Sequence, residues 1–407
     1  MIAALERLDA STAGWLAQHD SALEHLPDAL AATEPHWSLH DVRWTPGQGC
    51  QLAYQVAAGD SGAATFIALN LDPHGWSQHD YSTDPFLPGL PTAADSDLVL
   101  DDLARVVGEP ILHCRVRPVR YRPGSRCVLR YDVLTAAGPA RYYAKVFTPA
   151  VFADTAGRAM LVAAAAQPAL GVARVLAVWP ALYATVGAAV DGRSASAVLR
   201  DDTVPFRRRT DLANRLGGLL ADFHALTGVS VPLRTTSDQL IALADLQPAV
   251  EMMDAALGDR LRRLVDDLAR HLPPNDRLEV LTHGGFRAGQ VTFDDEGRLC
   301  LLDLDGVCRS DAARDLGNAL SHLSWQAIRQ SLPGSEVPLI SQALLAGYES
   351  RGRPVDRVSL AWWQAAALAQ IAARRFRRLE VADWVLVPRL LDLAENLLHS
   401  PQTSGST

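Results

Sequence analysis

The stretch "THGGFRAGQV", residues 282–291, decides how the rest of this sequence is interpreted. It follows a short apolar run and contains His283, a glycine pair that includes Gly285, and Gln290. Residues 291–305 then alternate between apolar and polar types around the turn DDEG, which predicts two short strands in a hairpin. The second strand leads into "LLDLDG", so Asp303 stands twenty residues after His283. An imidazole, an amide and a carboxylate are therefore expected around one small hairpin.

The side chains that follow this loop suit a hard cation. Mg²⁺ takes oxygen ligands from carboxylates and amides, so we expect Asp303 and Gln290 to ligate it. Asp305 is a second candidate, because a strand through residues 303–305 would direct both carboxylates to one face. The alternative is that both carboxylates belong to an exposed turn after the strand.

Composition places the chain among ordinary globular proteins. Its 407 residues are 48% apolar and 21% charged, enough for two or three structural units around a large core. A net charge of −8 argues against a general nucleic-acid or anionic-membrane surface, although local basic patches remain compatible with it. We find no apolar run of membrane-span length, no signal-peptide pattern and no metal-ligand spacing among the five cysteines. A cytoplasmic protein with reduced thiols is the expectation.

The basic residues are unusually uneven. Of the 38 basic residues only Lys145, in "RYYAKVF", is a lysine. Exposed positions accept either basic residue, so a lone lysine indicates a place where a compact ammonium is needed and a planar guanidinium does not serve. The alternative is that one lysine survived drift.

A repeat links Lys145 to an earlier part of the chain. Eight of fifteen positions are identical between residues 42–56 and 119–133, and Trp44 aligns with Tyr121. The simplest account is a duplicated β-hairpin with a Pro-Gly turn and a further strand. At the same offset Lys145 aligns with Ala68, so only the second copy carries the ammonium. The first copy is expected to extend or cap the sheet.

The remaining patterns predict an α+β fold. Residues 1–35 have helical apolar spacing, residues 73–100 are rich in Pro, Asp and Ser and are expected to form a connecting loop, and helices dominate from about residue 193. We therefore expect a small antiparallel β lobe, with the duplicated hairpin unit and an N-terminal cap, followed by a large, mainly helical lobe that contains the hairpin after His283.

The strings "YYAKVF", "LGGLLADFHAL" and "HGGFRAGQVTFDDEGRLCLLDLDGVCRSDAARDLG" together resemble the aminoglycoside phosphotransferase/choline kinase family. The resemblance covers roughly residues 115–395 in the family's order and spacing. It implies a bilobal protein-kinase-like fold that uses ATP and Mg²⁺. With the repeat and the terminal residues, the segments expected are 1–100, an N-terminal cap with the first hairpin repeat; 101–190, the nucleotide-binding lobe; 191–399, the helical lobe; and 400–407, a disordered tail.

The resemblance also implies roles for single residues. His283 would brace the catalytic loop, Asp315 in "RDLG" would be structural, and Asp303, Gln290 and Asp305 would hold the metal. The nucleotide would be contacted by the "RPGSRC" turn, by the lone lysine and by a hinge near residues 190–192. The residues expected to make these contacts are Lys145, Ser125, Arg126, Ala188 and Val190.

Three features depart from the family pattern. Gly285 stands where the family has its catalytic Asp, and loss of such a base typically costs ~10²–10⁴-fold in rate. Between Lys145 and Arg200 the sequence has no Glu to pair with the lysine, and Asp154 is the first acid. The "RPGSRC" turn is not a GxGxxG loop. Gln290 replaces Asn with a longer amide, which resembles maltokinase-like relatives.

Two functions follow as hypotheses. The first is an ATP-dependent phosphotransferase that acts on a hydroxyl of a small molecule or of a peptide Ser or Thr, in specialised metabolism. The second is a catalytically inactive pseudokinase, a nucleotide- or peptide-binding scaffold for a partner biosynthetic enzyme. No nucleic-acid or membrane partner is expected.

Three further features are expected to be structural. His224 is predicted to be a packed helix residue, and the arginines at 207–209 and 374–378 are predicted to lie on solvated helix faces. The alternative for the second run is a grip on an anionic substrate or partner segment.

Overall fold

The computed structural model describes residues 8–57, 64–166, 170–190, 192–273, 279–294 and 297–399. The chain forms two compact units, each built from separate segments. The first, here called the β unit, comprises residues 1–157, 174–189 and 375–382, and the second, the helical unit, comprises residues 158–173, 190–374 and 383–407. The segment expected at 1–100 and most of the segment expected at 101–190 thus fall in the β unit, whereas residues 158–173 and 190 belong to the helical unit. The expected tail 400–407, Asp191 of the expected hinge and two residues of the DDEG turn lie outside the described residues.

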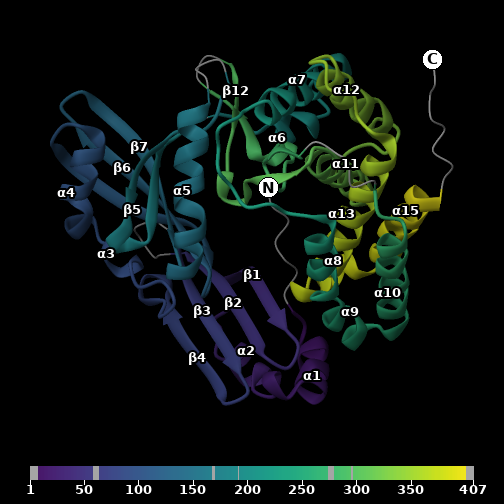
Figure 1. Cartoon of the computed structure of the whole chain (residues 1–407). Coiled ribbons are helices and arrows are strands. Elements are labelled where there is room, and N and C mark those ends of the chain that lie inside the picture. Colours follow the sequence, from purple (N-terminus) through teal and green to yellow (C-terminus); the bar gives the residue numbers. More distant parts are fainter. Residues whose placement is uncertain are drawn as a thin grey trace. The chain divides into compact units, whose positions relative to one another are not determined.

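Two antiparallel sheets form the β unit (Figure 1). The first sheet has the order β1-β2-β3-β4, and the second has the order β5-β6-β7-β9-β8. The strands of the first are β1 (Trp37–Thr45), β2 (Gly49–Ala57), β3 (Ala64–Asp72) and β4 (Gly75–Asp80). Those of the second are β5 (Ile111–Arg122), β6 (Arg126–Thr135), β7 (Gly138–Phe147), β8 (Val175–Trp179) and β9 (Ala184–Ala188). The helices are α1 (Ala10–His19), α2 (Leu26–Ala31), α3 (Leu90–Ala94) and α4 (Ser96–Val107), and α5 (Pro149–Ala165) begins here.

Strand register bears out the duplicated hairpin. Trp44 pairs with Cys50 across β1 and β2, and Tyr121 pairs with Cys127 across β5 and β6, so both hairpins have the same register 77 residues apart. Trp44 and Tyr121 are completely buried. The two copies therefore use the same large residue at the same position to fill their cores.

The third strands of the two copies are out of step, which corrects the alignment of Lys145 with Ala68. Lys145 pairs with Val128, whereas Gln51, the equivalent of Val128, pairs with Asn70. The register differs by two residues because the connection between the second and third strands is two residues longer in the first copy. Asn70, and not Ala68, is the structural counterpart of the lysine.

The duplication also extends upstream of the hairpins. Residues 20–29 and 84–93 share Asp, Leu, Leu, Pro and Ala at equivalent positions, and the shared leucines and alanines are completely buried. Asp20 accepts hydrogen bonds from Trp44 Nε1 (2.8 Å) and Gly47 N (3.1 Å). In the second copy Asp84 accepts them in the same way, from Tyr121 Oη (2.7 Å) and Gly124 N (2.8 Å). Each Pro-Gly turn is thus held by a buried carboxylate from the preceding segment.

The prediction of a connecting loop at residues 73–100 is wrong. This stretch contains β4, α3 and the first turn of α4, and Figure 1 shows the two helices beside β5 and β6. The Pro and Asp residues that suggested a loop are located where helices begin. Pro91 lies in the first turn of α3, and Asp95 caps α4 by accepting a hydrogen bond from Asp97 N at 2.8 Å. Helix α4 is an insertion in the second copy, which lengthens the offset between the copies from 64 to 77 residues.

Helices make up most of the helical unit. They are α6 (Ala195–Leu199), α7 (Phe206–His224), α8 (Thr236–Ala244), α9 (Gln247–Met253), α10 (Ala255–Arg270), α11 (Ala313–Ile328), α12 (Val337–Glu349), α13 (Arg357–Arg377), α14 (Val381–Trp384) and α15 (Val387–His399). Two short antiparallel pairs accompany them: β10 (Glu279–Thr282) with β13 (Cys308–Asp311), and β11 (Val291–Phe293) with β12 (Leu299–Leu301). In the described part of the chain every helix is too short or too polar to cross a bilayer.

Helices α7 and α12 pack closely because each places a glycine against the backbone of the other. A Cβ on Gly217 would lie 1.9 Å from Leu344 O, and one on Gly347 would lie 1.9 Å from Asn214 O. Arg209, predicted to lie on a solvated helix face, is instead buried and donates from Nη2 to Glu336 Oε1 at 2.9 Å. The arginine joins α7 to the start of α12.

We expect Asp84→Ala to lower the free energy of unfolding by about 3 kcal/mol, because three donors, including Phe86 N at 2.8 Å, would lose a buried, charged acceptor. Tyr121→Phe should cost about 1 kcal/mol, since it removes one of those bonds. Urea unfolding measures both values. Asp97→Ala, at an exposed position of α4, is the control, and an Asp84→Ala loss as small as the control's would contradict this account.

Candidate functional site

The loop from His283 to Gln290 is held by one buried carboxylate. Asp315, in the first turn of α11, is completely buried. Its Oδ2 accepts from His283 N at 2.6 Å, and its Oδ1 accepts from Phe286 N at 3.2 Å. Asn318 extends the hold, because its Nδ2 donates to Phe286 O at 2.8 Å. The backbone of the loop is therefore fixed to the start of a core helix.

His224 completes the environment of this carboxylate. It lies at the end of α7 and is 3% exposed; its Nε2 is 3.2 Å from Asp315 Oδ2, and its Nδ1 is 2.9 Å from Tyr348 Oη. Burial alone would raise the pKa of Asp315, but the hydrogen bond and charge of His224 lower that pKa below its usual value. The prediction of a packed helix residue agrees with this burial. The sequence offered no sign of its pairing with Asp315 or Tyr348.

The His283 ring and Gln290 connect the loop to the segment after β12. His283 Nε2 lies 2.8 Å from Leu302 O, and Leu302 N donates to Gln290 O at 2.8 Å. Both ends of the loop are thus bonded to the residue that precedes Asp303.

Asp303 has an unusual backbone conformation. Its φ is 65°, in the left-handed region that Asp tolerates better than most residues and that is enriched at functional sites. The strand expected through residues 303–305 is wrong, because β12 ends at Leu301 and Asp305 lies in a short 3₁₀ turn, Leu304–Gly306. The two carboxylates therefore do not share a strand face.

The side chains of Gln290 and Asp303 lie next to each other. Gln290 Nε2 donates to Asp303 Oδ2 at 3.4 Å, while Gln290 Oε1 is buried and has no hydrogen-bond partner among the residues that the structure describes. A buried acceptor without a donor is costly, and a cation beside the carboxylate would satisfy it. Within the described ranges no group of three His, Cys, Asp or Glu side chains could hold a metal. Mg²⁺ binds proteins through one or two side chains and keeps several waters, so this pair fits Mg²⁺.

The two adjacent glycines of the loop, Gly284 and Gly285, differ in the space around them. Gly284 has a φ of 80°, and a Cβ there would lie 2.0 Å from Gly306 O, so only glycine fits. Gly285 has no such constraint: in the described part of the structure an added Cβ meets no atom within 4 Å. The backbone would therefore accept a side chain at residue 285, although the sequence has none.

The residues predicted to contact a nucleotide lie mainly in the β unit. Lys145 lies on β7, paired with Val128 on β6 and Thr185 on β9. Ser125 lies in the Pro-Gly turn between β5 and β6, Arg126 begins β6, and Ala188 ends β9, whereas Val190 belongs to the helical unit. The structure thus gathers His283, Gln290, Asp303 and Asp315 in the helical unit and most of the proposed nucleotide contacts in the β unit.

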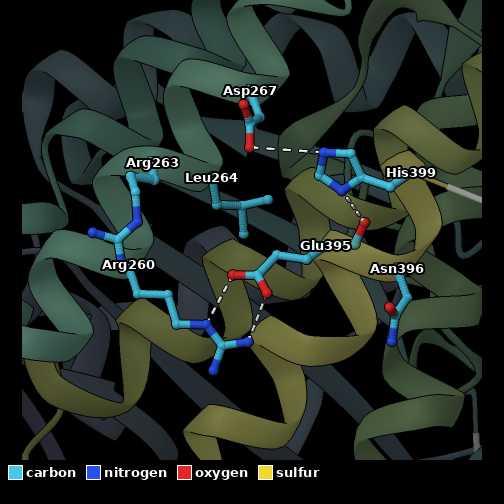
Figure 2. Close-up of a pocket in the computed structure, with 7 residues that line it drawn as sticks. All are labelled: Arg260, Arg263, Leu264, Asp267, Glu395, Asn396 and His399. Atoms are coloured by element: carbon cyan, nitrogen blue, oxygen red, sulfur yellow. Dashed lines mark hydrogen bonds and ion pairs between the residues drawn. The ribbon is translucent and has the colours of Figure 1, made fainter.

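A separate hollow lies between α10 and α15 of the helical unit (Figure 2). Its volume is about 490 Å³, and its lining residues are Arg260, Arg263, Leu264, Asp267, Glu395, Asn396 and His399. Arg260 donates to Glu395 through Nε at 2.8 Å and through Nη2 at 2.7 Å, and His399 faces Asp267 at 4.0 Å. These charges are paired within the wall, and the hollow contains none of the predicted site residues.

Comparison with known proteins identifies one family and several solved structures of similar fold. The phosphotransferase enzyme family matches residues 128–357, which is more than half of the chain. No curated protein matches the sequence. A crystal structure of a putative aminoglycoside phosphotransferase from Ralstonia eutropha JMP134 is 17% identical, with a TM-score of 0.53 over 70% of this chain and 92% of that one.

Two other solved structures are similar. A thermostable mutant of the aminoglycoside phosphotransferase APH(4)-Ia is 14% identical, with a TM-score of 0.51 over 75% of this chain and 100% of that one. An aminoglycoside-3'-phosphotransferase of type VIII is 23% identical, with a TM-score of 0.48 over 67% and 98%. The family match confirms the resemblance, and the first two structures confirm the predicted fold class, an antiparallel sheet lobe and a helical lobe.

We expect Asp315→Asn to lower the free energy of unfolding by about 3–5 kcal/mol at neutral pH, since the amide cannot replace a buried charged acceptor. The pKa of Asp315 is lowered in the folded state, so its stabilisation is complete above its unfolded pKa near 3.8 and declines as pH falls further. The difference between wild type and variant should therefore be constant above about pH 5 and shrink in stronger acid.

Urea unfolding at a series of pH values tests this dependence. Asp266→Asn, at an exposed position of α10, is the matched control and should unfold like the wild type throughout. A difference for Asp315→Asn that grows toward acid pH would contradict the assignment.

Proposed function

We propose that this chain, which belongs to the phosphotransferase enzyme family, transfers a phosphoryl group from ATP to a hydroxyl group of an acceptor. The acceptor is a small molecule or a peptide Ser or Thr, and the setting is a biosynthetic pathway in the cytoplasm. One observation carries the proposal: Gln290 donates from Nε2 to the carboxylate of Asp303, while its buried Oε1 has no hydrogen-bond partner among the described residues.

The chain's own residues divide the work of phosphoryl transfer. Asp303 and Gln290, with Asp305 as a further candidate, would hold Mg²⁺, which supplies charge neutralisation to the phosphate oxygens. Lys145 would bind the phosphates through its ammonium group, while Ser125, Arg126, Ala188 and Val190 are the remaining proposed nucleotide contacts. His283 and Asp315 would act on the loop itself, by fixing the backbone on which residue 285 and Gln290 lie.

The missing base limits the rate and does not exclude the reaction. Phosphoryl transfer passes through a loose transition state that depends mainly on positioning and electrostatics. Gly285 offers no carboxylate to take the acceptor's proton, so we propose a turnover reduced by ~10²–10⁴ relative to an enzyme with that base. An acceptor hydroxyl that is already acidic, or that brings its own base, would lose less.

Gly285 also favours a second function. A chain that retains the magnesium ligands and the lysine but lacks the base could bind nucleotide without turning it over. It would then serve as a nucleotide- or peptide-binding scaffold for a partner biosynthetic enzyme. The two functions share the same nucleotide site and differ only in the chemical step.

We expect Asp303→Asn to abolish phosphoryl transfer and to weaken stabilisation of the protein by Mg-ATP, because a neutral amide holds the metal less well. The measurement is mass spectrometry of hydroxyl-bearing acceptors incubated with the enzyme and Mg-ATP, with thermal unfolding in parallel. Asp266→Asn is the control for charge loss elsewhere in the unit. Equal activity and equal Mg-ATP stabilisation in wild type and Asp303→Asn would rule out this metal site.

Gly285→Asp separates the two functions. The backbone accepts a side chain there, so the variant should fold, and an enzyme that lacks only its base should gain about tenfold to a thousandfold in kcat. A scaffold should show Mg-ATP stabilisation with no phosphorylated product in either form. Gly284→Asp is the control for backbone damage, because its Cβ would collide with Gly306 O.

A further inference from the structure

One face of the second sheet in the β unit is densely basic. Residues directly opposite each other on neighbouring strands lie on the same face. Four successive rows across β5, β6 and β7 lie on the face opposite the core cluster of Tyr121, Leu129 and Val146, and Phe147 at the end of the last row is buried. We call this surface the arginine face. Its rows are Arg115, Asp132 and Arg141; Arg117, Arg130 and Tyr143; Arg120, Val128 and Lys145; and Arg122, Arg126 and Phe147.

The arginine face has a large excess of positive charge. Its twelve residues include seven arginines, one lysine and one aspartate, for a net charge of +7, in a chain whose total charge is −8. Arg117 pairs directly with Arg130, and Arg122 pairs directly with Arg126. Like charges opposite each other destabilise a sheet. The strands therefore maintain this surface against a cost in stability.

Asp132 is shared by several arginines at one end of the face. Arg130 Nη2 lies 2.9 Å from Asp132 Oδ2, Arg141 Nε lies 3.2 Å from Oδ1, and Arg117 Nε lies 3.6 Å from Oδ2. The last distance is too long for a hydrogen bond, and Arg117 Nε is buried with no hydrogen-bond partner among the described residues. The carboxylate of Asp132 therefore does not satisfy Nε of Arg117.

The other end of the face repeats this pattern. Arg122 Nε lies 3.7 Å from Asp41 Oδ2 of β1 and is also buried without a hydrogen-bond partner in the part of the chain described. Burial and the neighbouring charge of Arg120 lower the pKa of Arg122 to about 10, although Asp41 opposes the shift. Arg117 and Arg122, five residues apart on β5, are thus arranged to accept further anionic groups.

The dimensions of the arginine face exceed those of a nucleotide's phosphates. From Arg115 to Arg122 the strand spans about 23 Å at ~3.3 Å per residue. A triphosphate bound at the row of Lys145 would cover only the nearest rows and leave the end at Asp132 untouched. The side chains of Arg117, Arg122 and Arg130 keep 32%, 28% and 25% of their surface exposed, although Nε of Arg117 and Nε of Arg122 are buried.

We propose that the arginine face binds an extended, acidic polypeptide segment whose Asp or Glu residues occupy alternate positions. Successive rows are about 6.6 Å apart, which is also the spacing of alternate side chains in an extended peptide. Carboxylates at such positions would meet one row each, and arginine binds carboxylates through charge-assisted, two-point hydrogen bonds. This binding does not depend on phosphoryl transfer and would operate in either function proposed above.

The test uses the full chain and a fluorescein-labelled peptide of about twelve residues with Glu at alternate positions and Thr between them, followed by fluorescence anisotropy without nucleotide. We expect binding that weakens steeply with salt. A peptide of the same composition with its Glu residues in one block should bind about tenfold less tightly, and a Lys-for-Glu peptide should not bind. The double variant Arg117→Gln/Arg130→Gln should lose about tenfold or more in affinity.

Controls separate this proposal from its alternatives. Arg105→Gln/Arg262→Gln removes two exposed arginines elsewhere and should bind like the wild type. Equal affinity for the alternating and blocked peptides, or an unchanged affinity in the double variant, would overturn the proposal. So would binding of pyrophosphate or ATP that depends on Arg117 and Arg130 while no peptide binds. Failure of phosphoryl transfer with intact peptide binding would count against the proposed reaction alone.

If the double variant does not fold, the comparison of the three peptides on the wild-type chain still decides the outcome.

Discussion

The carboxylate of Asp315 is the constraint on which the loop from His283 to Gln290 depends. It is completely buried, and it remains charged because two backbone N–H groups and His224 surround it. A buried carboxylate of this kind is stable only when its acceptor sites are filled, so the loop cannot move without exposing an unpaired charge. The conformation of Gly284 and the bonds of His283 to the Asp303 segment follow from that anchor. The loop can therefore keep its shape without a side chain at residue 285.

Sequence reasoning located the features whose signal is local. The match of residues 42–56 to 119–133 predicted two hairpins of equal register, and the spacing of His283, Gln290 and Asp303 predicted their proximity. It failed where a local pattern has two meanings. The Asp and Pro residues of 84–95 suggested a loop, although they start helices and clamp a turn, because capping and loop residues are the same types.

The arginine face was also invisible in the sequence, for a geometric reason. Along β5 its arginines stand at 115 and 117 and then at 120 and 122, which simple alternation assigns to opposite faces. The register shifts between Pro118 and Arg120, and the extra residue returns Arg120 and Arg122 to the face of the first two. A single irregularity thus assembles one continuous surface from two sets of residues. The upstream part of the duplication was hidden similarly, by the insertion of α4.

Asp20 and Asp84, which hold the two Pro-Gly turns, have a consequence for the origin of the β unit. Each copy contains its own turn, its own anchoring acid and its own buried leucines, and Phe66 and Ala68 of the first copy share a core with Tyr121 and Leu129 of the second. A module that cannot cover its apolar side alone is covered by a sibling, as in tandem-repeat proteins. Two such modules on one polypeptide are a fused pseudo-dimer. Selection can change one half while the other remains a packing partner: the first copy has Asn70 at the position where the second has Lys145.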